Sequence, residues 1–300
     1  MPKLPPASDD LRASPHVNGT NGSPGPAPDP TPTDRYLDLL KRCLTRFDFD
    51  DDLDPIVFGA PWRRRLWAEA SKLLARKDIV AFRKRPFEAW IREEGRDWPT
   101  RAETMIGLRR LDNLQECIET VVADDVPGDL LEAGIWRGGA GILMRAVLDV
   151  VGDRNRTVWL ADSFEGLPKP RPEHPADADD KHWTQPFLAV SVEEVKRNFT
   201  RYNMLDGRVR FLEGWFADTL PTAPIERLAV LRVDGDMYGS TMDVLDALYA
   251  KLSVGGFVII DDYGEIAQCR AAVEDFRSKH GIAEPIERID GTGVFWRRRR

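Results

Sequence analysis

Two aspartate-rich motifs each follow a run of apolar residues directly. The motif VDGD at Val233–Asp236 comes after LAVLR, and the motif IDDY at Ile260–Tyr263 comes after GFVI. If both runs are strands of one parallel sheet, their carboxyl ends open on the same edge and bring the carboxylates together. Several carboxylates within a few Å repel one another unless a cation lies between them. Oxygen ligands select a hard ion, so the sequence predicts Mg²⁺ bound by Asp234, Asp261 and Asp262.

A glycine-rich turn earlier in the chain predicts a nucleotide-like cofactor. The turn LEAGIWRGGAG (131–141) follows a predicted strand, and its small residues let the backbone approach a ligand closely. Asp162 closes the next predicted strand, where a carboxylate can accept hydrogen bonds from both ribose hydroxyls of an adenosyl group. Neither G-x-G-x-x-G nor a following Gly-Lys-Ser/Thr is present, which weakens the pyrophosphate and P-loop interpretations. After the third predicted strand, Trp215 offers an aromatic surface for adenine.

Alternating strands and helices are needed to position these two groups of residues, and the sequence predicts them. The runs LLEAGI, TVWLADS, VRFLEG, LAVLRVD and GFVIIDD are typical of strands, and GAGILMRAVLDVV, SVEEVKRNF, STMDVLDALYAKL and EIAQCRAAVEDFRSKH of helices. Such alternation implies parallel strands with helices on both faces. PIERID and GVFWRR, joined through Gly-Thr-Gly, predict a closing hairpin. We therefore predict an α/β, Rossmann-like class I methyltransferase fold with a seven-stranded, mostly parallel sheet, a terminal antiparallel hairpin and N-terminal helices; a dehydrogenase would more often continue into a second βαβαβ half.

Three regions are predicted along the chain. Residues 1–33 are dominated by Pro, Gly, Ser, Asn and Asp and predict a disordered leader. Residues 34–124 predict a helical cap or oligomerisation region, and residues 125–300 the catalytic domain that binds the cofactor. Within the cap we expect a helix from Tyr36, a solvated acidic loop in FDFDDDLDP, two or three helices between Trp62 and Glu94, and a helix over Arg101–Ala123.

Composition bears on the partners and the location of the protein. The net charge of −7 argues against a nucleic-acid binder, because such proteins need a positive field to displace phosphate counterions. The chain shows neither a secretory signal pattern nor an apolar stretch long enough to span a bilayer, so we expect no membrane association and a cytoplasmic location. The three cysteines have no metal-ligand spacing and predict neither disulfides nor a zinc site.

Eight short motifs occur in order along the chain. They are WP (98–99), TMIG (104–107), RLDNLQ (110–115), LEAG (131–134), WRGG (136–139), DSFEGLP (162–168), RVDGDMY (232–238) and VIIDDYG (258–264). Over Asp34 to Trp296 the sequence resembles the TylF/MycF family of macrocin-type O-methyltransferases. The resemblance implies a Rossmann-like fold, S-adenosylmethionine and Mg²⁺, and methylation of sugar hydroxyls on antibiotics such as macrolides and aminocoumarins. It also implies a homo-oligomer whose N-terminal helices help to cover the active site.

By position, the resemblance assigns roles to individual residues. Asp234, Asp261 and Asp262 would hold the metal, and Asp234 would also be the catalytic base. The residues that would contact the cofactor are Met105, Glu132, Gly134, Gly138, Asp162, Ser163, Glu213, Gly214 and Trp215. The expected reaction is direct displacement at the methyl group. Two adjacent hydroxyls of the acceptor would bind the metal, and Asp234 would take the proton.

Other activities remain open on the sequence alone. A catechol-type aromatic O-methyltransferase would use similar metal chemistry on a vicinal diol. A glycosyltransferase would use Asp234–Asp236 as a D-x-D motif for a nucleotide sugar, although this would not explain Asp261 and Asp262. A protein that binds the cofactor without catalysis would keep the fold, but a cluster of carboxylates is costly without a metal and a reaction.

A connection rich in Pro, Asp and His, Glu165–Gln185, follows Asp162 at the predicted active edge. Long connections at this edge commonly act as lids. His174 or His182 would then touch the acceptor, whereas solvent-facing histidines are the alternative. Asp243 and Asp246 are expected only to cap turns or to face solvent.

Overall fold

The structure, a computed structural model, describes residues 29–49, 53–56 and 58–300. Most of the predicted leader (1–28) and part of the acidic stretch (50–52) therefore lie outside the described residues. No helix in the described ranges is both long enough and apolar enough to cross a membrane.

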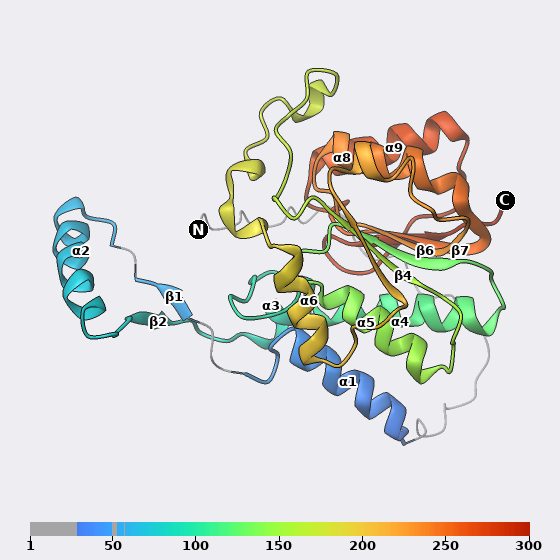
Figure 1. Cartoon of the computed structure of the whole chain (residues 1–300). Helices are drawn as coiled ribbons and strands as arrows, with labels where there is room; N and C mark the ends of the chain where they lie inside the picture. The colour runs from blue at the N-terminus through green and yellow to red at the C-terminus, as the bar shows by residue number, and fades with distance from the viewer. Residues whose placement is uncertain (1–28, 50–52, 57) are drawn as a thin grey trace, which may run out of the picture.

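Seven strands within the described residues form one sheet (Figure 1). They are β3 (Asp129–Ala133), β4 (Val158–Asp162), β5 (Val209–Glu213), β6 (Leu228–Val233), β7 (Leu252–Ile260), β8 (Glu287–Arg288) and β9 (Val294–Arg297). Their order is β5-β4-β3-β6-β7-β9-β8; β9 pairs antiparallel with both β7 and β8, and the five strands from β5 to β7 are parallel. The predicted fold class, including the terminal hairpin, is confirmed.

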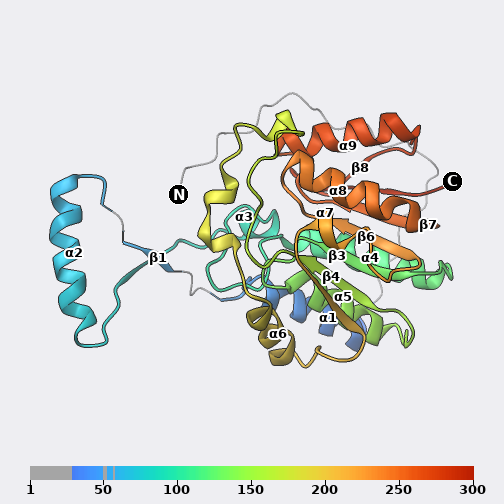
Figure 2. The same cartoon turned by 45° about the horizontal axis from the view of Figure 1, so that its top comes forward.

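Helices cover both faces of this sheet, because successive strand residues point to opposite sides. Leu130 and Val230 belong to a core shared with α1 (Pro32–Leu44), α4 (Leu108–Ala123), α5 (Gly139–Val150) and α6 (Val192–Arg201). Their neighbours Leu131 and Leu231 belong to a second core with α8 (Tyr238–Leu248) and α9 (Ala267–His280). Figure 2 shows α8 and α9 on one side of the strands and α1, α5 and α6 on the other.

The order of the strands creates a crevice at one edge of the sheet. The central strand β3 is flanked by β4 on one side and β6 on the other, both parallel to it. The loops after β3, β4 and β6 therefore leave the same edge and diverge toward opposite faces. In open α/β sheets this switch point is where ligands bind.

Two helix starts in the N-terminal region differ from the prediction. Helix α1 begins at Pro32, before the expected Tyr36, because Thr31 and Asp34 form a reciprocal capping box that ends the leader earlier. The helix expected over Arg101–Ala123 begins only at Leu108. The preceding segment is irregular where Gly107 lies so close to α3 (Ala89–Glu93) that a Cβ atom there would be 2.1 Å from the Glu93 carbonyl oxygen.

An arm made of β1 (Leu53–Pro55), α2 (Pro61–Ala75) and β2 (Phe82–Lys84) projects from the body of the molecule. Both views show α2 standing clear of the sheet and its helices (Figures 1 and 2). The two strands pair antiparallel and form the base of the arm. They were not predicted, and β1 falls in the stretch expected to be a solvated loop. Two or three helices were expected between Trp62 and Glu94; two are found among the described residues there, α3 and α2, which begins at Pro61.

Candidate active site

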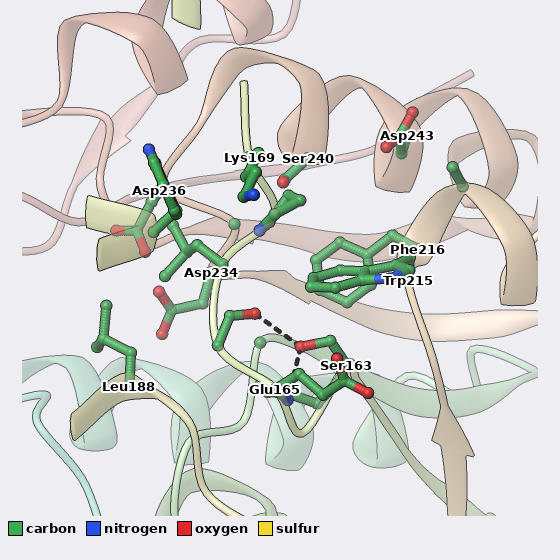
Figure 3. Close-up of a pocket in the computed structure, with 18 of the residues that line it drawn as sticks. Ser163, Glu165, Lys169, Leu188, Trp215, Phe216, Asp234, Asp236, Ser240 and Asp243 are labelled. Carbon is green, nitrogen blue, oxygen red and sulfur yellow. Dashed lines mark hydrogen bonds between the residues drawn. The ribbon is translucent and has the colours of Figure 1, made fainter. Parts of the chain in front are cut away.

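A cavity of about 680 Å³ lies at the crevice where the loops after β3, β4, β5 and β6 meet. Its size is in the range of sites for small molecules. Its walls include some of the site residues predicted from the sequence and part of the predicted lid. The lining residues include Met105, Gly134, Trp136, Asp162, Ser163, Lys169, Arg171, Trp183, Leu188, Trp215, Phe216, Asp234, Asp236, Ser240 and Asp243. Figure 3 shows the rings of Trp215 and Phe216 at one end and the carboxylate of Asp234 toward the other.

The loops around this cavity are joined by backbone hydrogen bonds that continue the sheet beyond its strands. Gly134 N–H donates to Ala161 O (2.9 Å) and Asp234 N–H to Ala133 O (2.8 Å). Gly134 has φ +86°, and a Cβ atom there would lie 1.8 Å from the Asp234 carbonyl oxygen. Only glycine satisfies both conditions, so the glycine-rich loop and the VDGD loop pack directly on each other.

Asp162 holds the glycine-rich loop in place. Its two carboxylate oxygens accept the backbone N–H groups of Ile135 and Phe164, each at 2.8 Å. Burial raises the pKa of Asp162, and the backbone hydrogen bonds oppose that rise. Since each carboxylate oxygen can accept more than one hydrogen bond, Asp162 keeps acceptor capacity toward the cavity that it lines.

The residues predicted to contact the cofactor divide into two groups. Met105, Gly134, Asp162, Ser163 and Trp215 line the cavity, whereas Glu132, Gly138, Glu213 and Gly214 do not. Gly138 instead begins α5 at φ +86°, where a Cβ atom would approach Val195 and Phe199 of α6 within 3 Å. Gly214, at φ +134°, turns the chain from β5 toward Trp215.

Glu132 is buried behind the cavity, and among the described residues only one of its two carboxylate oxygens has a hydrogen-bond partner. Its Oε1 accepts a hydrogen bond from Arg232 (2.7 Å), while Oε2 is buried without a hydrogen-bond partner among the described residues. Burial raises the pKa of Glu132 to about 8 despite the arginine. An unpaired buried carboxylate oxygen next to the cofactor loop suits a ligand that brings a cationic or hydrogen-bonding group.

Three carboxylates come together at the ends of β6 and β7. Asp234, Asp236 and Asp262 each place one oxygen within 4.8 Å of the other two. Asp262 Oδ2 is buried and has no hydrogen-bond partner among the described residues. Such a cluster of oxygen atoms matches the ligand preference of a hard divalent cation.

Asp261, which the sequence also assigned to the metal, lies in a different environment. One of its oxygens pairs with Arg232 and the other with Arg110, and the residue is only 4% exposed. Successive residues at a strand end point in different directions. Asp262 therefore reaches the carboxylate cluster, while Asp261 faces the arginines.

The electrostatics of the cluster reflect its crowding. Burial and Asp261 raise the pKa of Asp234 to about 6, although Arg232 Nη1 donates to its Oδ2 at 3.0 Å. Burial and Asp234 raise the pKa of Asp236 to about 7. Burial and the neighbouring carboxylates also raise the pKa of Asp262. Without a metal, the carboxyl groups of the cluster therefore hold their protons to a higher pH than free carboxyl groups, because like charges lie close together.

Several lining residues escaped the sequence prediction. Trp136 and Phe216 contribute aromatic walls, and Asp236 belongs to the predicted VDGD motif but was assigned neither to the metal nor to catalysis. Asp243 does not simply face solvent: it pairs with Arg171 of the lid at 2.7 Å and lines the cavity. The sequence shows an aromatic residue after β3 and after β5, but whether such a side chain points into the cavity depends on the backbone conformation, such as the φ of +45° at Trp136.

The two lid histidines do not line the cavity. His182 Nδ1 lies 2.8 Å from Asp180 Oδ2, and the His174 ring stacks near Tyr238, with 5.6 Å between the ring centroids. Seven lid residues do line it, among them the cationic Lys169 and Arg171 and the aromatic Trp183. The lid therefore reaches the cavity through cationic and aromatic side chains.

Comparison with known proteins gives matches to O-methyltransferases. The family model described as Macrocin-O-methyltransferase (TylF) matches residues 33–298. An 8-demethyl-8-(2,3-dimethoxy-α-L-rhamnosyl)-tetracenomycin-C 4'-O-methyltransferase from Streptomyces olivaceus is 51% identical over 268 residues, 88% of this chain and 92% of the relative. A mycinamicin III 3''-O-methyltransferase from Micromonospora griseorubida is 49% identical over 89% of this chain and 98% of the relative. A demethyldecarbamoylnovobiocin O-methyltransferase from Streptomyces niveus is 52% identical over 75% of this chain and 87% of the relative.

Solved structures agree with these matches. The structure of the O-methyltransferase NovP is 44% identical in sequence, with a TM-score of 0.73, over 89% of this chain and all of that one. The calicheamicin methyltransferase CalS11, at 20% identity over 80% of this chain and 94% of that one, has a TM-score of 0.52 and shares the fold.

Proposed function

Because the chain belongs to the TylF family of macrocin O-methyltransferases, and is thus an S-adenosylmethionine-dependent O-methyltransferase, we propose that it methylates a sugar hydroxyl of a glycosylated small molecule with the help of Mg²⁺. Family membership removes the glycosyltransferase alternative. The observation that carries the proposal is one cavity with aromatic rings at one end and clustered carboxylates at the other. The relatives methylate, by name, a rhamnosyl-bearing tetracenomycin and two other antibiotic scaffolds.

The aromatic end of the cavity is proposed to hold the cofactor, which supplies an electrophilic methyl group on a sulfonium. Trp215 and Phe216 offer flat surfaces for adenine, and Asp162 and Ser163 offer acceptors for the ribose. The unpartnered Oε2 of Glu132 supports a contact to the amino group of the cofactor, which would satisfy that buried oxygen.

The carboxylate end is proposed to hold Mg²⁺, which supplies a Lewis acid that lowers the pKa of a hydroxyl bound to it. Asp234 and Asp262 belong both to the set predicted from the sequence and to the cluster in the structure. Among the described residues, the carboxyl groups around this point outnumber the two guanidinium groups that pair with them, and a divalent cation would offset the excess negative charge. The residues concerned are Glu132, Asp234, Asp236, Asp261 and Asp262, with Arg110 and Arg232.

The base is proposed to be Asp236, with Asp234, the base assigned from the sequence, as the alternative. Asp236 lines the cavity and forms no ion pair among the described residues, whereas Asp234 accepts a hydrogen bond from Arg232. The pKa of Asp236, raised to about 7, is close to the value at which a general base works best in neutral solution. If Asp236 is the base, Asp261 would become the third metal ligand by breaking its ion pair with one of its two arginines. If Asp236 is instead a metal ligand, Asp234 would take the proton.

A homo-oligomer is proposed on the evidence of the arm. Trp62, Leu66 and Leu73 follow one stripe of α2 at helical spacing and are 63–64% exposed. Trp67 lies outside this stripe, and its ring packs against Phe58, with 5.9 Å between centroids. A single chain gains nothing from an apolar stripe in water, and a second copy is the proposed cover. The N-terminal region would then serve as the oligomerisation region and as part of the cap.

The proposed function is tested by binding and turnover measured on the same preparation. Calorimetric titrations with S-adenosylmethionine, S-adenosylhomocysteine and UDP-glucose, each with Mg²⁺ and with EDTA, should give micromolar binding of the adenosyl ligands alone. Methyl transfer is then measured by mass spectrometry with the three glycosides named for the relatives and with catechol as a competing acceptor. Methylation of catechol but of no glycoside would overturn the sugar assignment and favour the aromatic alternative. Turnover that persists unchanged in EDTA would contradict the proposed requirement for Mg²⁺.

A further inference from the structure

The predicted lid, Glu165–Gln185, is docked on helix α8. It contains two short 3₁₀ turns, η1 (Pro175–Asp177) and η2 (His182–Thr184). The loop of Asp234–Asp236 leads into α8, which begins at Tyr238. Whatever fixes the start of α8 therefore also fixes the loop that carries two of the three clustered carboxylates.

Asp177 makes this attachment. Asp177 is only 1% exposed. Its Oδ1 accepts a hydrogen bond from Tyr238 N–H (2.7 Å), and its Oδ2 accepts one from Gly239 N–H (2.8 Å). Amides in the first turn of a helix have no partner within the helix, and a negative charge there is favourable. Met237, at the N-cap position, provides no side-chain hydrogen bond. The cap of α8 is thus supplied by the lid, about 60 residues earlier in the sequence.

Two more contacts hold the lid against α8. Arg171 Nη2 donates to Asp243 Oδ2 at 2.7 Å, and the His174 ring packs near Tyr238. The fit is tight at Gly239, where a Cβ atom would lie 2.7 Å from His174 Cδ2 and 2.9 Å from Arg171 Nη2. A methyl group at Gly239 would therefore require the side chains of His174 and Arg171 to shift.

We infer that Asp177 is a positioning residue that clamps the lid to α8 and thereby shapes the acceptor end of the cavity. Asp177 does not line the cavity itself, whereas Arg171 and Trp183 of the lid do, together with Asp234 and Asp236 of the loop before α8. Release of the clamp frees both walls at once. Among the residues proposed for the cofactor, Asp162 ends strand β4 and is held by the backbone of Ile135, and Trp215 lies on the loop after β5, so both keep supports outside the clamp. The inference rests on the proposed function in assigning this end of the cavity to the acceptor.

Two independent variants test the clamp. Asp177→Ala removes the capping carboxylate, and Gly239→Ala keeps that carboxylate but places a methyl group against the lid side chains of His174 and Arg171, which must shift. Hydrogen–deuterium exchange followed by mass spectrometry should show faster exchange in both the lid and the first turn of α8. The KM of the best glycoside should rise about fivefold or more, the factor that the loss of a helix cap implies. The Kd of S-adenosylhomocysteine should stay within about twofold, since its supports are untouched.

Matched controls lie close by. Asp179→Ala changes an exposed lid aspartate two residues away, and Gly207→Ala adds a methyl group where no atom lies within 4 Å. Both should behave as wild type. Asp177→Asn keeps one acceptor oxygen and should recover part of the loss in KM.

Unchanged exchange in both test variants would overturn the clamp, and faster exchange with an unchanged KM would overturn its role at the acceptor. If Asp177→Ala does not fold, Gly239→Ala decides alone. If wild-type protein methylates no glycoside, the proposed function fails, while the exchange data still judge the clamp.

Discussion

The carboxyl edge of the sheet and the arm are incomplete in opposite ways. At the edge, charged groups are buried: Arg232 is 2% exposed, and one oxygen each of Glu132 and Asp262 lacks a hydrogen-bond partner within the described part of the chain. On the arm, apolar groups are exposed, as Leu66 is at 64%. A buried charge without a partner and an exposed apolar stripe both cost free energy in the isolated chain. The difference is consistent with the two proposals made above, small polar ligands at the edge and a second protein surface on the arm.

The largest expected effect comes from removing a carboxylate at the edge. Asp236→Asn should lower kcat by about 10²–10⁴-fold, the usual contribution of a general base, while Mg²⁺ affinity changes little. Asp234→Asn should weaken Mg²⁺ binding as well. Steady-state kinetics and Mg²⁺ titration of both variants separate the roles, with the exposed Asp246→Asn as a control. Weaker Mg²⁺ binding in Asp236→Asn would make it a ligand and return the base role to Asp234.

The charge network behind the cluster should be the next most sensitive feature. Arg110 pairs with Asp261 and with Asp290 at 2.9 Å, and its side chain is 7% exposed. Arg110→Met leaves buried carboxylates without a partner and should cost about 3–5 kcal/mol in the free energy of unfolding. Urea denaturation measures this cost. The adjacent Arg109, 56% exposed and paired with Glu94, provides the control, because Arg109→Met should cost less than about 1 kcal/mol. Equal costs for the two variants would contradict the comparison.

The pH dependence of the metal-free protein sharpens the description of the edge. The pKa values of Asp234 and Asp236 are raised to about 6 and about 7, so the folded protein binds protons there that the unfolded chain releases near pH 4. Stability should therefore fall as the pH rises through 6 and 7. Mg²⁺ needs the ionised carboxylates, so its affinity should rise over the same range, by up to about tenfold per unit for each proton displaced.

Thermal unfolding and Mg²⁺ titration at pH 5.5, 6.5 and 8 check both signs. Added Mg²⁺ should raise the midpoint of unfolding most at pH 8. An affinity that does not vary with pH would mean that these carboxylates are already ionised at pH 5.5.

The smallest effect on the single chain is expected at the arm. Leu66→Glu combined with Leu73→Glu changes only exposed side chains and should alter the free energy of unfolding of one chain by less than about 0.5 kcal/mol. The same variant should dissociate the proposed oligomer, which light scattering after size-exclusion chromatography detects. Arg65→Glu, exposed on the same helix, is the control. A wild-type protein that is a single chain in solution would refute the proposed role of the arm.

Sequence periodicity predicted the sheet well, because its strands are buried on both faces and leave a clear apolar signal. The same signal misled at Met105, whose spacing fits a helix but which lies in the irregular segment before α4 and lines the cavity. The close contact between Gly107 and α3 keeps α4 from starting before Leu108, and such a tertiary contact leaves no pattern in the local sequence.

The candidate site was predictable by position but not by direction. The motif IDDY placed Asp261 and Asp262 at the correct edge, but only the structure shows that one faces two arginines and the other faces the cluster. Asp177 carried no signal at all, since its partner is the backbone of a helix that begins 61 residues later. Pairings between distant segments depend on tertiary structure, which local patterns do not encode.

The contact between Gly134 and the Asp234 carbonyl also has a practical meaning for engineering the enzyme. The glycine-rich loop and the VDGD loop share backbone hydrogen bonds with their neighbours and have no space between them, so neither can be exchanged without the other. The lid, by contrast, meets the rest of this site mainly through side chains. A designer who wants a different acceptor should therefore graft lids onto a constant pair of loops, and random libraries aimed at the loops themselves should yield mostly unfolded protein.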